Sequence, residues 1–350
     1  MKTLVAMACV VTFMLVGVTE AGVSEKSKER TIGVYNDWGK LREVVIGIED
    51  ETIEPEWMSA LSFLSAKAQE DCKKYGGKRT EDVLPEIVKQ LRSEIEGLVR
   101  ALESRGIIVH RTKPMRYKEE LAYLDSVQKG NHSFGGEDYF RVFGNKVILT
   151  NSLRLPFRRK HVYYVRPALE PLLEGTNAKY AAMPPPSPHY DENDLFLEAG
   201  DILLDGFNVY VGLSGKGSSK KGIAWLQQYL GPEYKVWTVI VDPSILHLDC
   251  VMTLIKPGLL VYYPDLVGEL PETVKNWDKI KLYRKPGEEE PFGANNLSLD
   301  ENTIIVPDRY PELAQDLKKR GMEVITLPFD MTIAYGAGPR CLTAVLKRDR

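Results

Sequence analysis

The 350-residue chain has little of several features that mark common classes of protein. It contains four cysteines and five histidines, and its formal net charge is −3. A charge so close to zero leaves no basic field to attract nucleic acid or anionic lipid. No low-complexity tract divides the chain, and its apolar leader is shorter than the roughly 20 residues of a membrane-spanning helix. These absences favour one globular domain with a small-molecule partner.

The first 21 residues have the three regions of a secretory signal peptide. Met1-Lys2-Thr3 is followed by an apolar run from Leu4 to Val18 and then by Thr19-Glu20-Ala21, which suits cleavage after Ala21. We predict residues 1–21 as a signal peptide, 22–30 as a flexible leader and 31–350 as a single catalytic domain. The predicted location is secreted or periplasmic, with an uncleaved membrane anchor as the alternative.

Removal of this leader leaves three cysteines, Cys72, Cys250 and Cys341. An odd number argues against a disulfide scaffold, although a bridge between Cys72 and Cys250 stays open at this stage. Cys341 ends the Gly-rich segment Ala334-Tyr-Gly-Ala-Gly-Pro-Arg-Cys341, where glycines allow a substrate to approach the backbone. We predict that Cys341 is a nucleophile. The plainer alternative is a buried apolar cysteine at the start of a last strand.

Strand pairs that begin with a polar residue recur at intervals of 63, 48, 47 and 45 residues, with starts at Asp138, Asp201, Asp249, Asn296 and Cys341. Helical spacing with glycine stops, as from Leu84 to Gly106, predicts a helix and a further strand after a hairpin. Such repetition is typical of propellers and arrays. We predict an α/β fold, a five-bladed pseudo-symmetric propeller of ββαβ units whose starting residues meet at one mouth. The alternative is five ordinary hairpins with Asp as a turn residue.

Several acids and one thiol at one mouth predict a cationic substrate. Guanidinium fits because two carboxylates can grip its paired N–H donors. Glu198-Ala-Gly-Asp201 and His247-Leu-Asp249 would supply a base, its orienting carboxylate and further acids. The thiol and one nearby histidine provide no four-ligand set, so we expect no metal and no cofactor. Gly212 to Ser219 lacks the Gly-Lys-Ser/Thr order of a P-loop and is predicted to be a flexible loop.

From about Tyr35 to the C-terminus the chain resembles the guanidine-modifying enzymes, and within them the amidinotransferases. The resemblance rests on Tyr35-Asn-Asp-Trp-Gly-Lys-Leu-Arg-Glu-Val-Val, Glu137-Asp138, Glu198-Ala-Gly-Asp201, His247-Leu-Asp249 and Gly338-Pro-Arg-Cys341-Leu-Thr. It implies transfer of an amidino group from arginine or a similar guanidine donor to an amine acceptor through a covalent amidino-Cys341 intermediate. The implied catalytic residues are Cys341, His247 and Asp201, with Asp201 orienting His247. The implied substrate-binding residues are Asp138, Asp249, Glu198 and Asn296.

Two other functions stay open. Arginine deiminases share the motifs around Glu198 and His247 almost as well, which makes a guanidine hydrolase the second hypothesis. A non-catalytic guanidine-binding protein is the third, but it would not need Cys341 beside His247. No partner beyond donor and acceptor is expected, apart from a homodimer that the sequence leaves open.

The acceptor amine is constrained by one departure from the family pattern. Where the glycine-dependent enzymes carry an arginine for the acceptor carboxylate, this chain has Leu266 after Pro264-Asp265. The resemblance therefore predicts an acceptor without such a carboxylate. The alternative is that Arg154, Arg158 or Arg159 recognises it.

Overall fold

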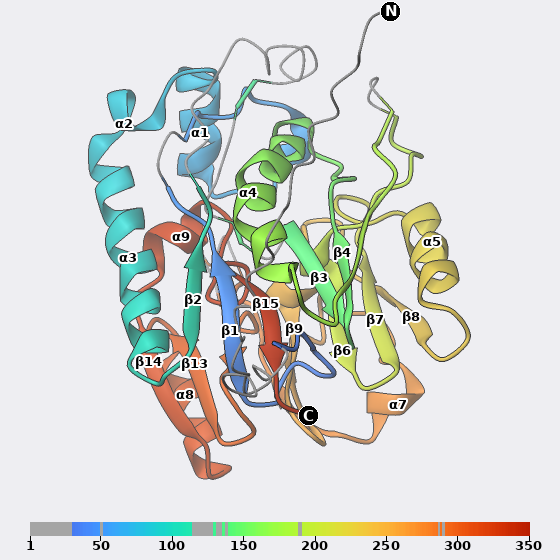
Figure 1. Cartoon of the computed structure of the whole chain (residues 1–350). Coiled ribbons are helices and arrows are strands. Elements are labelled where there is room, and N and C mark those ends of the chain that lie inside the picture. The colour runs from blue at the N-terminus through green and yellow to red at the C-terminus, as the bar shows by residue number, and fades with distance from the viewer. Residues whose placement is uncertain are drawn as a thin grey trace, which may run out of the picture.

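The structure is a computed structural model that describes residues 30–49, 52–113, 129–130, 135–136, 139–187, 191–285, 288 and 291–350. Within these residues the strands form five three-stranded sheets (Figure 1). In each sheet the middle strand pairs antiparallel with one neighbour and parallel with the other. The described fold is therefore mixed α/β, and its repeated unit is a hairpin, a helix and a parallel strand.

Four of the sheets are built from strands that follow one another along the chain. They are β3 (Phe140–Phe143), β4 (Lys146–Leu149) and β5 (Lys179–Ala182); β6 (Ile202–Asp205), β7 (Asn208–Leu213) and β8 (Lys235–Ile240); β9 (Met252–Lys256), β10 (Leu259–Tyr262) and β11 (Asp278–Lys281); and β12 (Leu297–Ser298), β13 (Thr303–Pro307) and β14 (Glu323–Leu327). Three of the hairpins turn on Gly144, Gly206 and Gly258, which have positive φ. Glycine adopts that conformation without the strain a side chain brings.

The fifth sheet joins the two ends of the described chain. Its middle strand β1 (Leu41–Ile46) pairs antiparallel with the last strand β15 (Thr343–Arg348) and parallel with β2 (Ile108–Arg111). Val44 lies opposite Val345 in this ladder. The pairing therefore brings Cys341, two residues before β15, next to segments from the beginning of the chain.

Helices connect the strands of each unit, and short helices or 3₁₀ turns precede several of the hairpins. They are α1 (Ala66–Tyr75), α2 (Thr80–Val83), α3 (Pro85–Glu103), α4 (Val162–Leu173), α5 (Lys220–Leu230), α6 (Leu248–Val251), α7 (Glu272–Lys275), α8 (Pro311–Lys319) and α9 (Asp330–Ala334), with 3₁₀ turns η1 (Ser59–Leu61), η4 (Pro156–His161) and η5 (Ala199–Asp201). Figure 1 shows α3 beside β2 and α5 beside β8, at opposite sides of the molecule. Among the described residues, no helix combines the length and apolar character needed to cross a membrane.

The longest helix, α3, follows the predicted periodicity. Leu91, Ile95, Leu98 and Leu102 are buried at three- and four-residue spacing, and Gly106, at φ +73°, stands beyond its end. A separate short helix, α2, begins at Thr80, and α3 itself begins at Pro85. Proline suits a first helical position, where no intrahelical N–H bond is lost.

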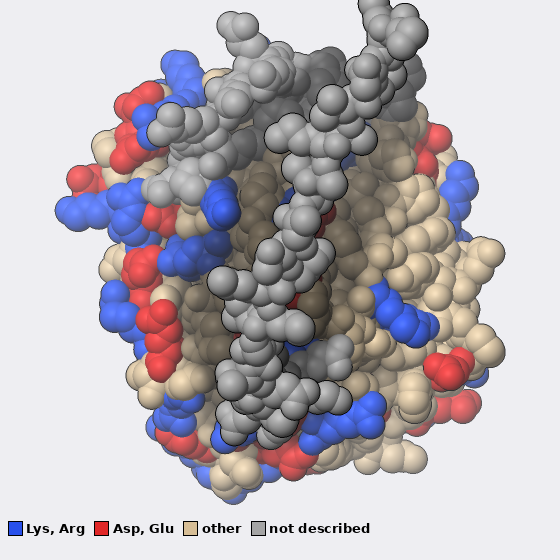
Figure 2. Space-filling model, viewed as in Figure 1, with Lys and Arg blue, Asp and Glu red and all other residues tan. Residues whose placement is uncertain are grey.

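Charged side chains of both signs are distributed over the visible surface. On the face seen in Figure 2, Lys and Arg lie among Asp and Glu around the rim of the molecule. This mixture agrees with the small net charge of the whole chain.

One carboxylate in the core predicts a pH-dependent stability. Glu54 is fully buried, and burial, together with the charge of Asp71, raises its pKa from 4.5 to about 7. Folded protein therefore binds more protons than unfolded protein between these values. The free energy of unfolding therefore falls by roughly 3 kcal/mol as pH rises from about 4.5 to 7. Above that range it levels off.

We expect Glu54→Gln to remove this dependence. In urea melts, the difference in free energy of unfolding between variant and parent should move in favour of the variant as pH rises from 5 to 8. Glu81, which is exposed on the neighbouring α2, supplies the matched Glu→Gln control. A constant difference across this range would mean that Glu54 keeps an ordinary pKa in the folded protein.

Candidate active site

The site is built around the Gly-rich turn that precedes β15. Gly336 has φ +85°, and a Cβ on Gly338 would come within 2.5 Å of the Asn295 side-chain oxygen. A residue with a side chain at position 338 would therefore displace Asn295. The turn presents Cys341, with 8% of its surface exposed, at the wall of a pocket.

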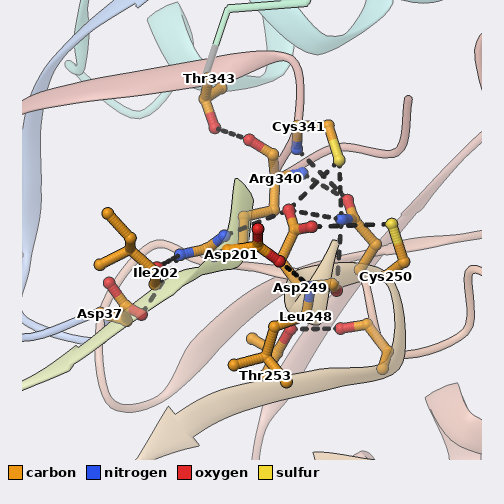
Figure 3. Close-up of polar contacts among 12 residues, drawn as sticks. Asp37, Asp201, Ile202, Leu248, Asp249, Cys250, Thr253, Arg340, Cys341 and Thr343 are labelled. Atoms are coloured by element: carbon orange, nitrogen blue, oxygen red, sulfur yellow. Dashed lines mark hydrogen bonds and ion pairs between the residues drawn. The ribbon is translucent and has the colours of Figure 1, made fainter. Parts of the chain in front are cut away.

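Figure 3 shows that the Cys341 thiol points toward the side chain of Asp249 on α6. The thiol donates a hydrogen bond to Asp249 Oδ2 at 3.2 Å, and Asn295 Nδ2 donates to both Cys341 Sγ at 3.0 Å and Asp249 Oδ2 at 2.9 Å. All three side chains are at least nine-tenths buried. Sequence reasoning chose Asp249 and Cys341 correctly as neighbours, but it missed Asn295.

The predicted residue Asn296 lies elsewhere. Its Nδ2 donates to Gly293 O, and its side chain lines a different pocket, with Asp37, Arg141 and Arg348. The prediction that Asn296 faces the substrate is therefore wrong in its placement, and the neighbouring Asn295 takes that position. Asn295 Oδ1 also accepts from the backbone N–H groups of Arg340 and Cys341, which holds the nucleophile turn in place.

Arg340, which the sequence analysis used only as part of a motif, has an evident structural role. Its guanidinium lies 3.1 Å from Asp249 Oδ2 and 3.4 Å from Asp37 Oδ2, and it donates to Ile202 O at 2.8 Å. Asp37 belongs to the Tyr35-Asn-Asp-Trp motif and also accepts from Arg141 and from Leu204 N. Asp37 of the N-terminal motif therefore helps to hold Arg340, the residue next to the nucleophile, in place.

The carboxylate that orients His247 is Glu198 rather than Asp201. Glu198 Oε2 lies 2.6 Å from His247 Nε2 and 2.8 Å from Arg158 NH1, while Oε1 accepts from Arg154 N. The prediction that Asp201 orients the ring is therefore corrected: Glu198, which was predicted to bind substrate, makes the hydrogen bond to His247, and Asp201 makes none. Both oxygens of Glu198 already have protein partners.

Asp201 instead anchors the backbone around the histidine. Its Oδ1 accepts from Leu248 N at 3.1 Å and its Oδ2 from Ser218 N at 2.7 Å. A Cβ on Gly217 would lie 2.5 Å from Asp201 Oδ2 and 3.0 Å from the His247 ring. The loop from Gly212 to Ser219, predicted to be flexible, is therefore a close-packed wall of the site.

The electrostatics favour a charged histidine and a protonated thiol in the free protein. Burial opposes a cation at His247, but its hydrogen bond to Glu198 and the charge of Asp201 outweigh burial and raise the pKa of the ring. Burial raises the pKa of Asp201 to about 6 against the charge of His247. Burial, the hydrogen bond with Cys250 and the charge of Asp249 raise the pKa of Cys341 well above its ordinary value.

The pocket beside Cys341 combines an apolar wall with a few polar groups. Leu61, Phe63, Leu64, Phe157, Leu246 and Tyr335 supply most of the wall, and Arg158, His161, His247 and Cys341 supply polar atoms. Leu266 is buried in the turn after β10 and is not among the residues lining this pocket. It therefore offers no direct support for the expectation about the acceptor carboxylate.

Asp138 lies outside the described residues. Cys72, Cys250 and Cys341 are free and buried, so no bridge joins Cys72 to Cys250. One group in the described chain has the spacing of metal ligands, because the ligand atoms of Asp249, Cys250 and Cys341 lie within 4.8 Å of one another.

Comparison with known proteins finds amidinotransferases among the relatives of this chain, although no family model matches it. L-arginine:L-lysine amidinotransferase of Pseudomonas savastanoi pv. phaseolicola is 24% identical over 355 residues, covering 90% of this chain and 93% of its own length. Inosamine-phosphate amidinotransferase 1 of Streptomyces griseus is 23% identical and covers 91% of this chain and 97% of its own. Along at least 90% of its length the chain is similar in sequence to amidinotransferases. It is therefore a transferase.

The solved structures agree with this family of transferases. SxtG, an amidinotransferase of Microseira wollei from a saxitoxin biosynthetic pathway, has a TM-score of 0.77 and 22% identity, covering 91% of this chain and 98% of its own. Dimethylarginine dimethylaminohydrolase of Pseudomonas aeruginosa is a more distant structural neighbour of this chain, at a TM-score of 0.60 and 16% identity. The transferase neighbour therefore has the closer fold.

Proposed function

We propose that the protein moves an amidino group from arginine or a similar guanidine to an amine acceptor through a covalent intermediate on Cys341. The observation that carries the proposal is the Cys341 thiol, which lies 3.2 Å from the Asp249 carboxylate at the wall of the pocket that His247 also lines. A carboxylate in this position can hold a guanidinium with its central carbon against the sulfur.

The first half-reaction forms one bond and breaks another. When the guanidinium binds, the Cys341 thiol gives its proton to solvent, and the thiolate attacks the guanidino carbon. The tetrahedral adduct expels the donor amine, which takes a proton from His247, and an amidino group remains on sulfur. The acceptor amine then attacks the same carbon and gives a proton to His247, the C–S bond breaks, and the released thiolate takes a proton from solvent, which returns Cys341 to its starting state.

Protonation states in the free protein suit this order of events. The raised pKa of Cys341 means that the thiol resists ionisation before substrate arrives, and a bound guanidinium would offset the negative charge of Asp249. His247 has Nε2 engaged by Glu198, which leaves Nδ1 to exchange a proton with the leaving and attacking amines. The proposed role of Glu198 is to orient and charge the ring.

The hydrolase alternative uses the same residues with water as the second nucleophile. It is less favoured because the amidinotransferase SxtG matches this chain with a TM-score of 0.77 against 0.60 for the aminohydrolase. A guanidine-binding protein without catalysis is disfavoured because it would not need Cys341 and His247 in one pocket.

Three further elements of the proposal concern the whole chain. We place the five sheets as the blades of one five-bladed propeller with a single catalytic domain over residues 31–350. This arrangement would gather the ends of α6, η5 and the nucleophile turn at one mouth. Residues 1–21 are proposed as a signal peptide for secretion or export to the periplasm, with a membrane anchor as the alternative.

The test is a product assay with arginine as donor, with and without a panel of amines that includes lysine, glycine and an amino-cyclitol. Ornithine that appears only with an amine, together with the amidinated amine, is the expected result. Citrulline would replace the transferase proposal by a hydrolase. Binding of arginine without any product would favour the non-catalytic alternative.

A further inference from the structure

A second thiol lies beside the proposed nucleophile. The sulfur atoms of Cys250 and Cys341 and the Asp249 carboxylate are within 4.8 Å of one another, and both thiols donate to that carboxylate. Figure 3 shows both sulfurs joined by dashed lines to the Asp249 side chain. Cys250 is on α6 and Cys341 is 91 positions further along the chain, so only the tertiary fold brings them together.

Both cysteines face space that a small molecule can reach. Cys341 lines the substrate pocket, and Cys250 lines an adjoining pocket that shares Phe63, Leu246 and Gly336 with it. Cys72 differs, because it is buried on α1 in the hydrophobic core, and burial raises its pKa to about 12. The chain therefore contains a paired dithiol at the site and a core cysteine that serves as its internal control.

We propose that Cys250 and Cys341 form an oxidation site, at which a peroxide converts the dithiol to a disulfide and so blocks the nucleophile. The blocking effect rests on the proposed function of Cys341, whereas the formation of the bond does not. The sulfurs need to close from at most 4.8 Å to about 2 Å, a movement that rotation of short side chains next to a Gly-rich turn can supply.

The reaction balances with one peroxide for each dithiol. The Cys341 sulfur loses its proton as it attacks one oxygen of hydrogen peroxide, the O–O bond breaks, and the departing hydroxide takes that proton, so that a sulfenic acid and one water form. The Cys250 sulfur then attacks the Cys341 sulfur, the S–O bond breaks, and a second water leaves. Two electrons pass from the two sulfurs to the peroxide, and a dithiol reductant reverses the change.

The same cluster is less suited to a metal ion. Arg340 lies 3.1 Å from Asp249 Oδ2, and Asn295 Nδ2 donates to both Cys341 Sγ and Asp249 Oδ2. A cation at this point would meet the guanidinium charge and the N–H donor. Disulfide formation removes two thiol protons without adding charge, so it is compatible with both neighbours.

The experiment exposes the full chain to hydrogen peroxide, with and without saturating arginine. Remaining thiols are then alkylated, and unreduced peptides are identified by mass spectrometry. We expect a cross-linked peptide that contains Cys250 and Cys341 and is lighter by two hydrogen atoms, the loss of two thiols, and loss of transferase activity that dithiothreitol restores. Arginine should slow all three changes, because it covers Cys341.

Two variants sharpen the result, each compared with its own starting rate. Cys72→Ala should behave as the parent does. Cys250→Ser should form no cross-link, and its Cys341 should proceed to a sulfinic acid that dithiothreitol does not restore. The proposal fails if peroxide yields no Cys250–Cys341 peptide, if Cys250→Ser recovers as the parent does, or if a chelator rather than dithiothreitol restores activity. A cross-link in a protein without transferase activity would contradict only the proposed function.

Discussion

Cys341→Ala is expected to abolish amidino transfer while arginine still binds. No other described thiol can take over, because Cys72 lies in the core and Cys250 lines the adjoining pocket, beyond the Asp249 carboxylate. Asp249 keeps its contacts to Arg340 and Asn295 in the variant and can still hold a guanidinium. Steady-state rates and calorimetric titration with arginine would measure the two properties separately.

Cys72→Ala is the matched control and should remain active, since it removes a thiol of the same type far from the pocket. Quenched reactions of the parent with arginine alone should also carry one amidino group on the peptide that contains Cys341. Normal turnover by Cys341→Ala, or an amidino group on another residue, would show that the nucleophile is misassigned.

Glu198→Gln is expected to lower kcat by about 10⁴, the loss that follows replacement of the orienting carboxylate in a Ser-His-Asp triad. The amide can no longer stabilise the imidazolium of His247, so the pKa of that ring should fall. Because His247 must be protonated to serve the leaving amine, the alkaline limb of the kcat profile should therefore move to lower pH. A purely structural role of Glu198 would lower the rate without moving this limb.

The same substitution also leaves Arg158 without its ion pair, so stability needs its own measurement. Glu198→Asp keeps the charge and should recover part of the rate if it folds. Glu86→Gln, at an exposed position on α3, supplies the matched control. Asp201→Asn should affect kcat less than Glu198→Gln, because Asp201 accepts from backbone N–H groups around His247 and makes no hydrogen bond to the ring. A larger effect at Asp201 would restore the original assignment.

The chemical composition of the site was predictable because it depends on residue type and local pattern. A cysteine after closely spaced glycines, a His-x-Asp and a Glu-x-x-Asp segment are visible in the chain, and three of these residues, Cys341, His247 and Asp249, lie at the described site. The repeated unit was predictable for the same reason, since hairpins, helical spacing and glycine stops are local signals.

The division of roles among neighbouring residues was not predictable in this way. Glu198 precedes a single 3₁₀ turn and Asp201 ends it. Which of the two carboxylates meets the His247 ring depends on where Arg158 and the loop around Ser218 lie. Likewise Asn295 and Asn296 differ by one position, and consecutive side chains at the start of a strand point to opposite sides. A sequence pattern lacks the information about which side faces the thiol.

The sequence by itself determined the class of chemistry, the repeat and the identity of the nucleophile candidate, because these follow from residue types and from spacing within a few turns. The tertiary structure decided that Glu198 charges His247, that Asn295 and Arg340 hold the nucleophile turn, and that Cys250 lies beside Cys341. Each of these contacts joins residues more than 40 positions apart. Hydrogen-bond distances across different sheets arise only when the sheets have packed.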